Sequence, residues 1–182
     1  MSWVALLAFA FVAQAEKMEH KLSWEISVSG QRIGQRDITI KYVPGEDVGR
    51  RRILESWTEI DGNAGPMRLV YRQRMTAHAT EREPASFHSV MEQNGVPVEV
   101  QARWTPSAWW VTTNSAGRQR TVDVPVNRID ISTADLFDPD TRFPLARFEQ
   151  VRILSAETGA TLVGDVKDLG SRSVAWAIMR WR

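Results

Sequence analysis

The sequence predicts a mainly β protein, an antiparallel meander curled into a barrel or half-barrel, with one or two short helical turns. Three observations predict this class. Apolar and polar residues alternate with a period of two, turn-forming residues separate the alternating segments, and no long segment has the 3.6-residue period of an amphipathic helix. Parallel βαβ architecture is disfavoured because it requires such helices between its strands.

Four strands are expected in the first half of the domain. Leu22, Trp24, Ile26 and Val28 alternate with polar residues, as in a strand with one buried face. The four strands are expected at residues 22–28, 37–42, 51–60 and 67–75. Turn-forming clusters separate them: GQRIG at 30–34, Pro-Gly at 44–45 and DGNAGP at 61–66. The first two strands are expected to pair as a hairpin.

The dipeptide Asn94-Gly95 is the strongest hairpin signal, because both residues tolerate the positive φ angles of a type I′ turn. Residues 115–117 (Ser-Ala-Gly) indicate another turn. Strands are expected around these two turns at residues 87–93, 96–104, 108–114 and 118–126. Every second residue from Val96 to Trp104 lies on one expected face.

The pattern changes at Ser132, where a capping hydroxyl precedes an acidic residue. We therefore expect one or two short helical turns between Ser132 and Ala146. Three further strands are expected at residues 147–154, 160–167 and 173–181, which brings the total to about ten or eleven.

The amino terminus is typical of a signal peptide. Residues 3–15 are uncharged and apolar, and they end in Ala13-Gln14-Ala15, the small-x-small pattern that signal peptidase reads. This run is too short to span a bilayer, which takes about 20 residues of helix. We expect cleavage after Ala15 and a periplasmic or secreted location. We also expect a single β-rich domain over residues 16–182 and no transmembrane segment in the mature chain.

Composition narrows the classes of function. The formal net charge is +1, from 23 basic and 22 acidic residues, so the whole molecule has no field that would attract nucleic acid. The chain has no cysteine, which excludes disulfides, thiolate metal sites and cysteine nucleophiles. Eight tryptophans are the one compositional excess. Tryptophan fills cores, lines apolar pockets or lies at interfaces.

The Gly-Gln-Arg-Ile-Gly segment at residues 30–34, together with the export signal and the successive hairpins, resembles uncharacterised periplasmic half-barrel proteins. These are similar in outline to the lipoprotein-carrier fold, in which a curved antiparallel sheet surrounds an apolar cavity. The resemblance implies a fold more than a function. The long helix pair that fills such a half-barrel is missing here, unless residues 132–146 form a reduced lid.

Export, antiparallel strands and excess aromatic residues lead to the first functional hypothesis. The chain is expected to be a non-enzymatic domain that binds an apolar or amphipathic, lipid-like ligand in the concavity of the sheet. Its expected lining residues are Trp24, Trp57, Tyr71 and Trp104.

The second hypothesis is an accessory subunit or protein-interaction module of a cell-envelope complex. Neighbouring residues of a strand point to opposite faces, so one of Trp109 and Trp110 is expected outside the core, either as a docking patch or over a second small core. Arg68, Arg72 and Arg74 share one strand face and, with the arginines at 50–52, suit phosphate head groups. The opposing interpretation pairs them with Glu55 and Glu59 across the hairpin.

Catalytic and metal-binding motifs are not found. The sequence contains no Gly-x-Ser-x-Gly elbow and no phosphate-binding glycine loop. His20, His78 and His88 have no metal-ligand spacing, although His78 and His88 flank a loop that holds Glu81 and Glu83. We therefore expect no enzymatic activity, no metal and no cofactor.

Overall fold

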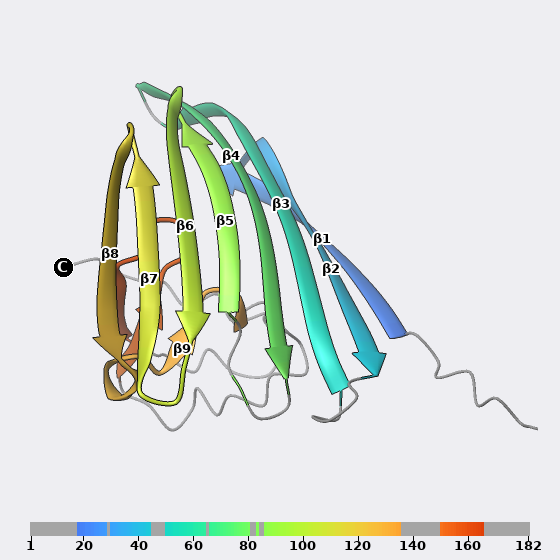
Figure 1. The fold of residues 1–182 in the computed structure, drawn as a ribbon. Helices are drawn as coiled ribbons and strands as arrows, with labels where there is room; N and C mark the ends of the chain where they lie inside the picture. Colours follow the sequence, from blue (N-terminus) through green and yellow to red (C-terminus); the bar gives the residue numbers. More distant parts are fainter. Residues whose placement is uncertain are drawn as a thin grey trace, which may run out of the picture.

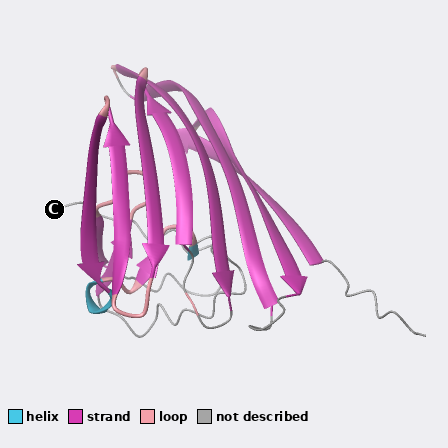
Figure 2. Ribbon diagram, viewed as in Figure 1, coloured by secondary structure: helices cyan, strands magenta, loops and turns pink. Residues whose placement is uncertain are grey.

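A computed structural model describes residues 18–28, 30–44, 50–64, 66–80, 83, 86–135 and 150–165. Most of these residues lie in strands, and the 3₁₀ turn η1 (Val126–Arg128) is the one complete helical element among them (Figure 2). The expected β class is confirmed. The expected signal peptide and the expected strand at 173–181 lie outside the described residues.

The main sheet has eight strands in the order β1 to β8, each antiparallel to the next, as an up-and-down meander (Figure 1). Its strands are β1 Met18–Val28, β2 Gln31–Pro44, β3 Arg50–Ala64, β4 Met67–Thr80, β5 Ser86–Gln93, β6 Val96–Trp104, β7 Ala108–Ser115 and β8 Arg118–Pro125. Within the described residues β1 and β8 do not pair with each other, so the sheet is a curved, open half-barrel.

Two glycines that the sequence predicts in turns lie inside strands instead. Gly34 pairs with Ile60 in β3, and a Cβ atom at Gly34 would lie 2.3 Å from the carbonyl oxygen of Glu59. A Cβ atom at Gly62 would lie 2.6 Å from Cγ2 of Ile33. These glycines permit close approach of adjacent strands, which lets β2 and β3 extend well beyond their predicted ends.

The two-residue turns behave as predicted. Asn94 and Gly95 have φ angles of 49° and 82°, and Ala116 and Gly117 have 49° and 76°. Asn94 also bonds to β4, because its backbone N–H donates to Val70 O at 2.8 Å and its side-chain oxygen accepts from Val70 N at 2.9 Å. The turn between β5 and β6 therefore also holds this hairpin against the neighbouring strand β4.

The face of the main sheet that carries the hydrophobic core is here called the inner face, and the opposite one the outer face. One row of paired residues on the inner face crosses the sheet and is almost wholly inaccessible to solvent. Its members are Ile40, Leu54, Ala77, Phe87, Ala102 and Val111.

A second, three-stranded sheet covers part of the inner face. It contains β9 Ile131–Ser132, β10 Gln150–Leu154 and β11 Thr161–Asp165, and η1 (Val126–Arg128) precedes it. Leu154 and Ala156 join the core of the main sheet. Gly159 lies against β6 and β7, since a Cβ atom there would be 3.0 Å from Val111. The small sheet thus closes the core from the inner side.

The small sheet corrects two predictions. Residues 131–132 form a strand where a helix start is predicted, and β10 pairs with β9 in parallel instead of continuing the meander. Ser132 nonetheless makes the hydrogen bonds expected of a capping residue, because its hydroxyl donates to Asp135 Oδ2 at 2.7 Å and accepts from Asp135 N at 3.3 Å. Most of the segment 132–146 lies outside the described residues. Within the described ranges, no helix has the length and apolar character needed to cross a bilayer.

Candidate binding site on the outer face of the sheet

The four aromatic residues predicted to line one concavity do not share a face. Trp24 and Trp104 pack against the core on the inner face, and Tyr71 is on the same face. Trp57 is on the outer face, where 38% of its surface is exposed. The prediction is wrong for Trp57 because the inner positions of β3 are taken by Leu54, Ser56 and Thr58, in register with the core residues of β2 and β4.

The inner face becomes polar away from the small sheet. Arg36 donates to Thr58 Oγ1 at 2.7 Å and to Gln73 Oε1 at 2.9 Å, and Gln73 donates to Ser89 Oγ at 3.0 Å. Burial lowers the pKa of the Arg36 guanidinium. These bonds satisfy polar groups that are costly to bury alone, so the network supports the register of four strands.

Two further groups complete this polar region. The hydroxyl oxygen of Ser56 is buried and has no hydrogen-bond partner within the described part of the chain. Burial also raises the pKa of the Tyr71 hydroxyl, and the carboxylate of Glu157 acts in the same direction. The inner face thus combines an apolar region under the small sheet with a polar region beyond it.

Trp109 and Trp110 separate as the alternation predicts. Trp109 is a core residue with 2% of its surface exposed, whereas Trp110 points outward and is 52% exposed. Trp109 therefore cannot belong to an outer docking patch. Trp110 is the member of the predicted pair that is free to contact a ligand or partner.

The predicted cationic strip is largely neutralised. Arg68 lies 3.2 Å from Asp61, and Arg72 lies 3.2 Å from Glu59. The guanidinium of Arg74 lies over the ring of Trp57, 5.4 Å from its centroid. These three arginines share the outer face of β4. Carboxylates on β3 match the charges of Arg68 and Arg72, whereas Arg74 stacks on an indole and Glu55 pairs with Lys41. This favours the pairing interpretation for two of the three arginines.

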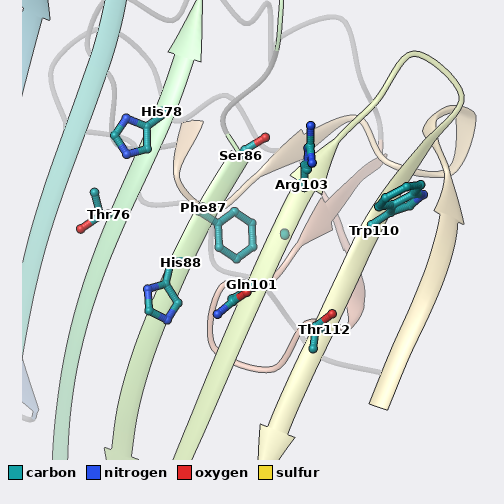
Figure 3. A pocket seen from close by; sticks show the side chains of 10 residues that line it. Thr76, His78, Ser86, Phe87, His88, Gln101, Arg103, Trp110 and Thr112 are labelled. Carbon is teal, nitrogen blue, oxygen red and sulfur yellow. The ribbon is translucent and has the colours of Figure 1, made fainter. Parts of the chain in front are cut away.

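A shallow open groove of about 640 Å³ lies on the outer face and crosses β4 to β7. Figure 3 shows its side chains projecting from four adjacent strands. The buried residues Phe87 and Ala102 lie in its floor, and the other lining residues are Thr76, His78, Ser86, His88, Gln101, Arg103, Trp110 and Thr112. The volume is in the range of small-molecule sites in proteins.

Hydrogen bonds hold the middle of the groove in place. Glu99, beside the groove on β6, accepts a bond of 3.0 Å from Gln101 Nε2 and lies 2.8 Å from His88 Nε2. The bond to His88, followed by that from Gln101, lowers the pKa of the Glu99 carboxyl. At the end of the groove, Ser86 Oγ accepts from Trp104 N at 3.0 Å. Several lining side chains are therefore oriented before any ligand arrives.

Other lining groups are free to bond. Arg103 and His78 make no hydrogen bond or ion pair within the described part of the chain. Arg103 is the cross-strand partner of Trp110, so a guanidinium and an exposed indole lie side by side on one face. Among the described residues, no group of three or more histidine, aspartate or glutamate side chains is placed to hold a metal ion.

Sequence reasoning identified part of this groove. It singled out Trp110, and it placed His78 and His88 at the ends of one loop, but it missed Gln101, Arg103 and Thr112. The available signal was the alternation in β6 and β7, where these residues occupy the positions between core residues. Their convergence depends on the register of four strands, which alternation within one strand does not specify.

No family model, curated protein or solved structure matches this chain. The function of the chain is therefore inferred from the geometry of the groove and the chemistry of its residues.

Proposed function

We propose that this chain is an exported, non-enzymatic binding module that uses the groove on its outer face to hold a constituent of the cell envelope. The observation that carries the proposal is the position of Trp110, which is 52% exposed, directly beside Arg103 on the neighbouring strand. Arg103 makes no hydrogen bond or ion pair within the described part of the chain. Tryptophan and arginine dominate the binding energy of many interfaces, because they combine a large apolar surface with directed hydrogen bonds.

Pre-organisation supports the same proposal. The groove lies on interior strands of a sheet, so its backbone is rigid, and Glu99 already orients His88 and Gln101. A rigid site loses less conformational entropy on binding than a loop does. The groove is therefore better suited to recognition than an equally polar loop would be.

Cosedimentation with isolated envelope material tests the proposal. The purified protein is mixed with membrane and wall fractions, and bound protein is compared among wild type, Trp110→Ala and Arg103→Ala. We expect each variant to bind about tenfold more weakly or worse, as at a binding hot spot. Trp57→Ala is the matched control, because it removes another exposed tryptophan of the outer face that lies outside the groove. Equal binding by all four proteins would rule out the groove.

A second candidate function is the binding of an amphipathic, lipid-like ligand on the inner face. The observation in its favour is the change from apolar to polar residues along that face, with a buried Ser56 hydroxyl that lacks a partner in the described part of the chain. We expect lipid in native mass spectra of freshly purified protein and quenching of tryptophan fluorescence by added acyl chains. Protein that carries no lipid and does not respond would exclude this function.

Export is part of the proposal and has its own test. Expression of the full chain in a bacterium with an outer membrane should give a periplasmic protein whose amino terminus is Glu16. Mass spectrometry of the intact protein from each fraction measures this directly. Uncleaved protein in the cytoplasm would contradict it.

A further inference from the structure

We infer that the ligand of the outer groove is an acidic saccharide, a chain of sugar rings that carry carboxylates. This inference rests on the proposed function, since it names the chemistry of the molecule that the groove holds. Three properties of the groove lead to it: its backbone groups are already paired within the sheet, its only large exposed apolar side chain is Trp110, and the lining carries a positive charge.

The backbone of the groove is already used. Strands β4 to β7 are interior strands of the main sheet, each paired on both sides. An extended peptide binds a sheet by adding a strand to a free edge, where N–H and C=O groups are available. The groove offers only side chains, so its ligand must supply its own closely spaced hydrogen-bonding groups.

The apolar surface of the groove suits one ring and not a chain. Trp110 is the one large apolar side chain of the lining that is exposed, because Phe87 and Ala102 are each 4% exposed and belong to the core. An acyl chain or an apolar helix would bury little surface here. A sugar ring has an apolar C–H face and hydroxyl groups at its rim, so it can stack on an indole while bonding to polar neighbours.

Uncharged polar side chains line much of the rest of the groove. Thr112 follows on the same strand, and Thr76 and His78 lie at the far side of the groove (Figure 3). Gln101 donates from its amide nitrogen to Glu99, which leaves its amide oxygen as an acceptor for a hydroxyl. At the usual spacing of strands the groove is about 14 Å wide from β4 to β7, enough for more than one sugar ring.

The charge of the groove selects an acidic sugar. Arg103 is the one lining residue with a permanent charge, and no lining residue is a carboxylate. Two carboxylates lie beside the lining: Glu99, which is bonded to His88 and Gln101, and the exposed Asp123, which pairs with Trp110 from the β8 side, opposite Arg103. Cross-strand neighbours have Cβ atoms about 5 Å apart, so a ring stacked on Trp110 places a substituent within reach of Arg103. A guanidinium binds a carboxylate through two parallel hydrogen bonds.

Calorimetric titration of the full chain with trigalacturonate and with its methyl ester tests the inference. The two probes share the same rings, and esterification removes the charge of each carboxylate and adds a methyl group to it. We expect trigalacturonate to bind and the ester to bind about tenfold more weakly. Trp110→Ala should weaken binding of both probes, Arg103→Met should remove the preference for the acid, and Trp57→Ala should bind as wild type does. Circular dichroism checks that each variant is folded.

The outcomes separate this inference from the proposed function. Failure of trigalacturonate to bind, or equal binding of acid and ester, overturns the acidic-saccharide inference. If the groove variants still lose envelope binding in that case, the groove functions with another ligand and the proposed function survives. If they bind envelope material as wild type does, both fail. Inorganic phosphate that binds as tightly as trigalacturonate would also overturn the inference, because it would show charge recognition without ring recognition.

Discussion

The guanidinium of Arg52 on β3 lies 2.8 Å from the carboxylate of Asp135, a residue 83 positions further along the chain. Both side chains are largely buried, with 16% and 8% of their surfaces exposed. Asp135 also accepts a hydrogen bond from the hydroxyl of Ser132, the last residue of β9 in the small sheet. This ion pair therefore connects the main sheet to the segment that forms the small sheet.

Breaking the Arg52–Asp135 pair from one side should destabilise the fold strongly. Asp135→Asn or Arg52→Met removes one side of this largely buried ion pair, and we expect a loss of about 3–5 kcal/mol in the free energy of unfolding. Urea denaturation measures it. Lys41→Met is the matched control, because Lys41 and Glu55 are also 2.8 Å apart but more exposed, and it should cost much less. Equal losses would show that burial of the Arg52–Asp135 pair has no role.

Replacing the two adjacent tryptophans should have opposite consequences. Trp109→Ala opens a cavity in the core and should lower the free energy of unfolding by about 3–5 kcal/mol. Trp110→Ala removes a side chain that is 52% exposed and should change it by about 0.5 kcal/mol or less. Thermal melts of the two variants decide the matter, and a large loss at both positions would contradict an outward-facing Trp110.

The loss of stability on acidification should depend in part on Asp130. Its carboxylate accepts from Arg152 Nη2 at 2.7 Å and from Arg152 Nε at 3.1 Å, and these bonds lower the pKa of the Asp130 carboxyl. A carboxyl whose pKa is lower in the folded state than in the unfolded state stabilises the fold at any pH above its unfolded-state pKa of about 3.9. This stabilisation is lost as the pH falls through the folded-state pKa.

Asp130→Asn should therefore be less stable than wild type at pH 7, and the difference should shrink on acidification to pH 2.5. Melting temperatures over that range measure it. Asp123→Asn serves as the control, because Asp123 is exposed and makes no hydrogen bond within the described residues. A difference that stays constant with pH would argue against the Asp130–Arg152 bond.

Two glycines near the first hairpin should respond differently to alanine. Gly34→Ala places Cβ against the backbone of β3 and should cost about 1–3 kcal/mol or more, because neither strand can move without breaking its ladder. Gly30→Ala meets no atom but must adopt a φ angle of 80°, which should cost about 1–2 kcal/mol. Denaturation midpoints compare them, and a Gly34→Ala variant as stable as wild type would contradict the close approach of β2 and β3.

Much of the fold follows from patterns within short segments. Alternation predicts the strands and their two faces, and Asn94-Gly95 predicts its turn, because a pleated strand and a type I′ turn are set by local backbone geometry. The same local rule separates Trp109 from Trp110.

Local patterns do not say which face is buried when both faces carry large apolar residues. In β3 the sequence offers Trp57 on one face and Leu54 with two small polar residues on the other. The tertiary structure buries the second face, because its register with β2 and β4 places Leu54 between Ile40 and Ala77. Trp57 consequently lies outside.

By itself, the sequence determined the β class, most of the strands and the outward position of one tryptophan of a pair. Only the tertiary structure decided that Gln101, Arg103 and Trp110 meet in one groove and that Arg52 pairs with Asp135. The physical reason is that alternation records the direction of a side chain relative to its own strand. The neighbours of that side chain depend on the register between strands and on packing between residues far apart in the chain.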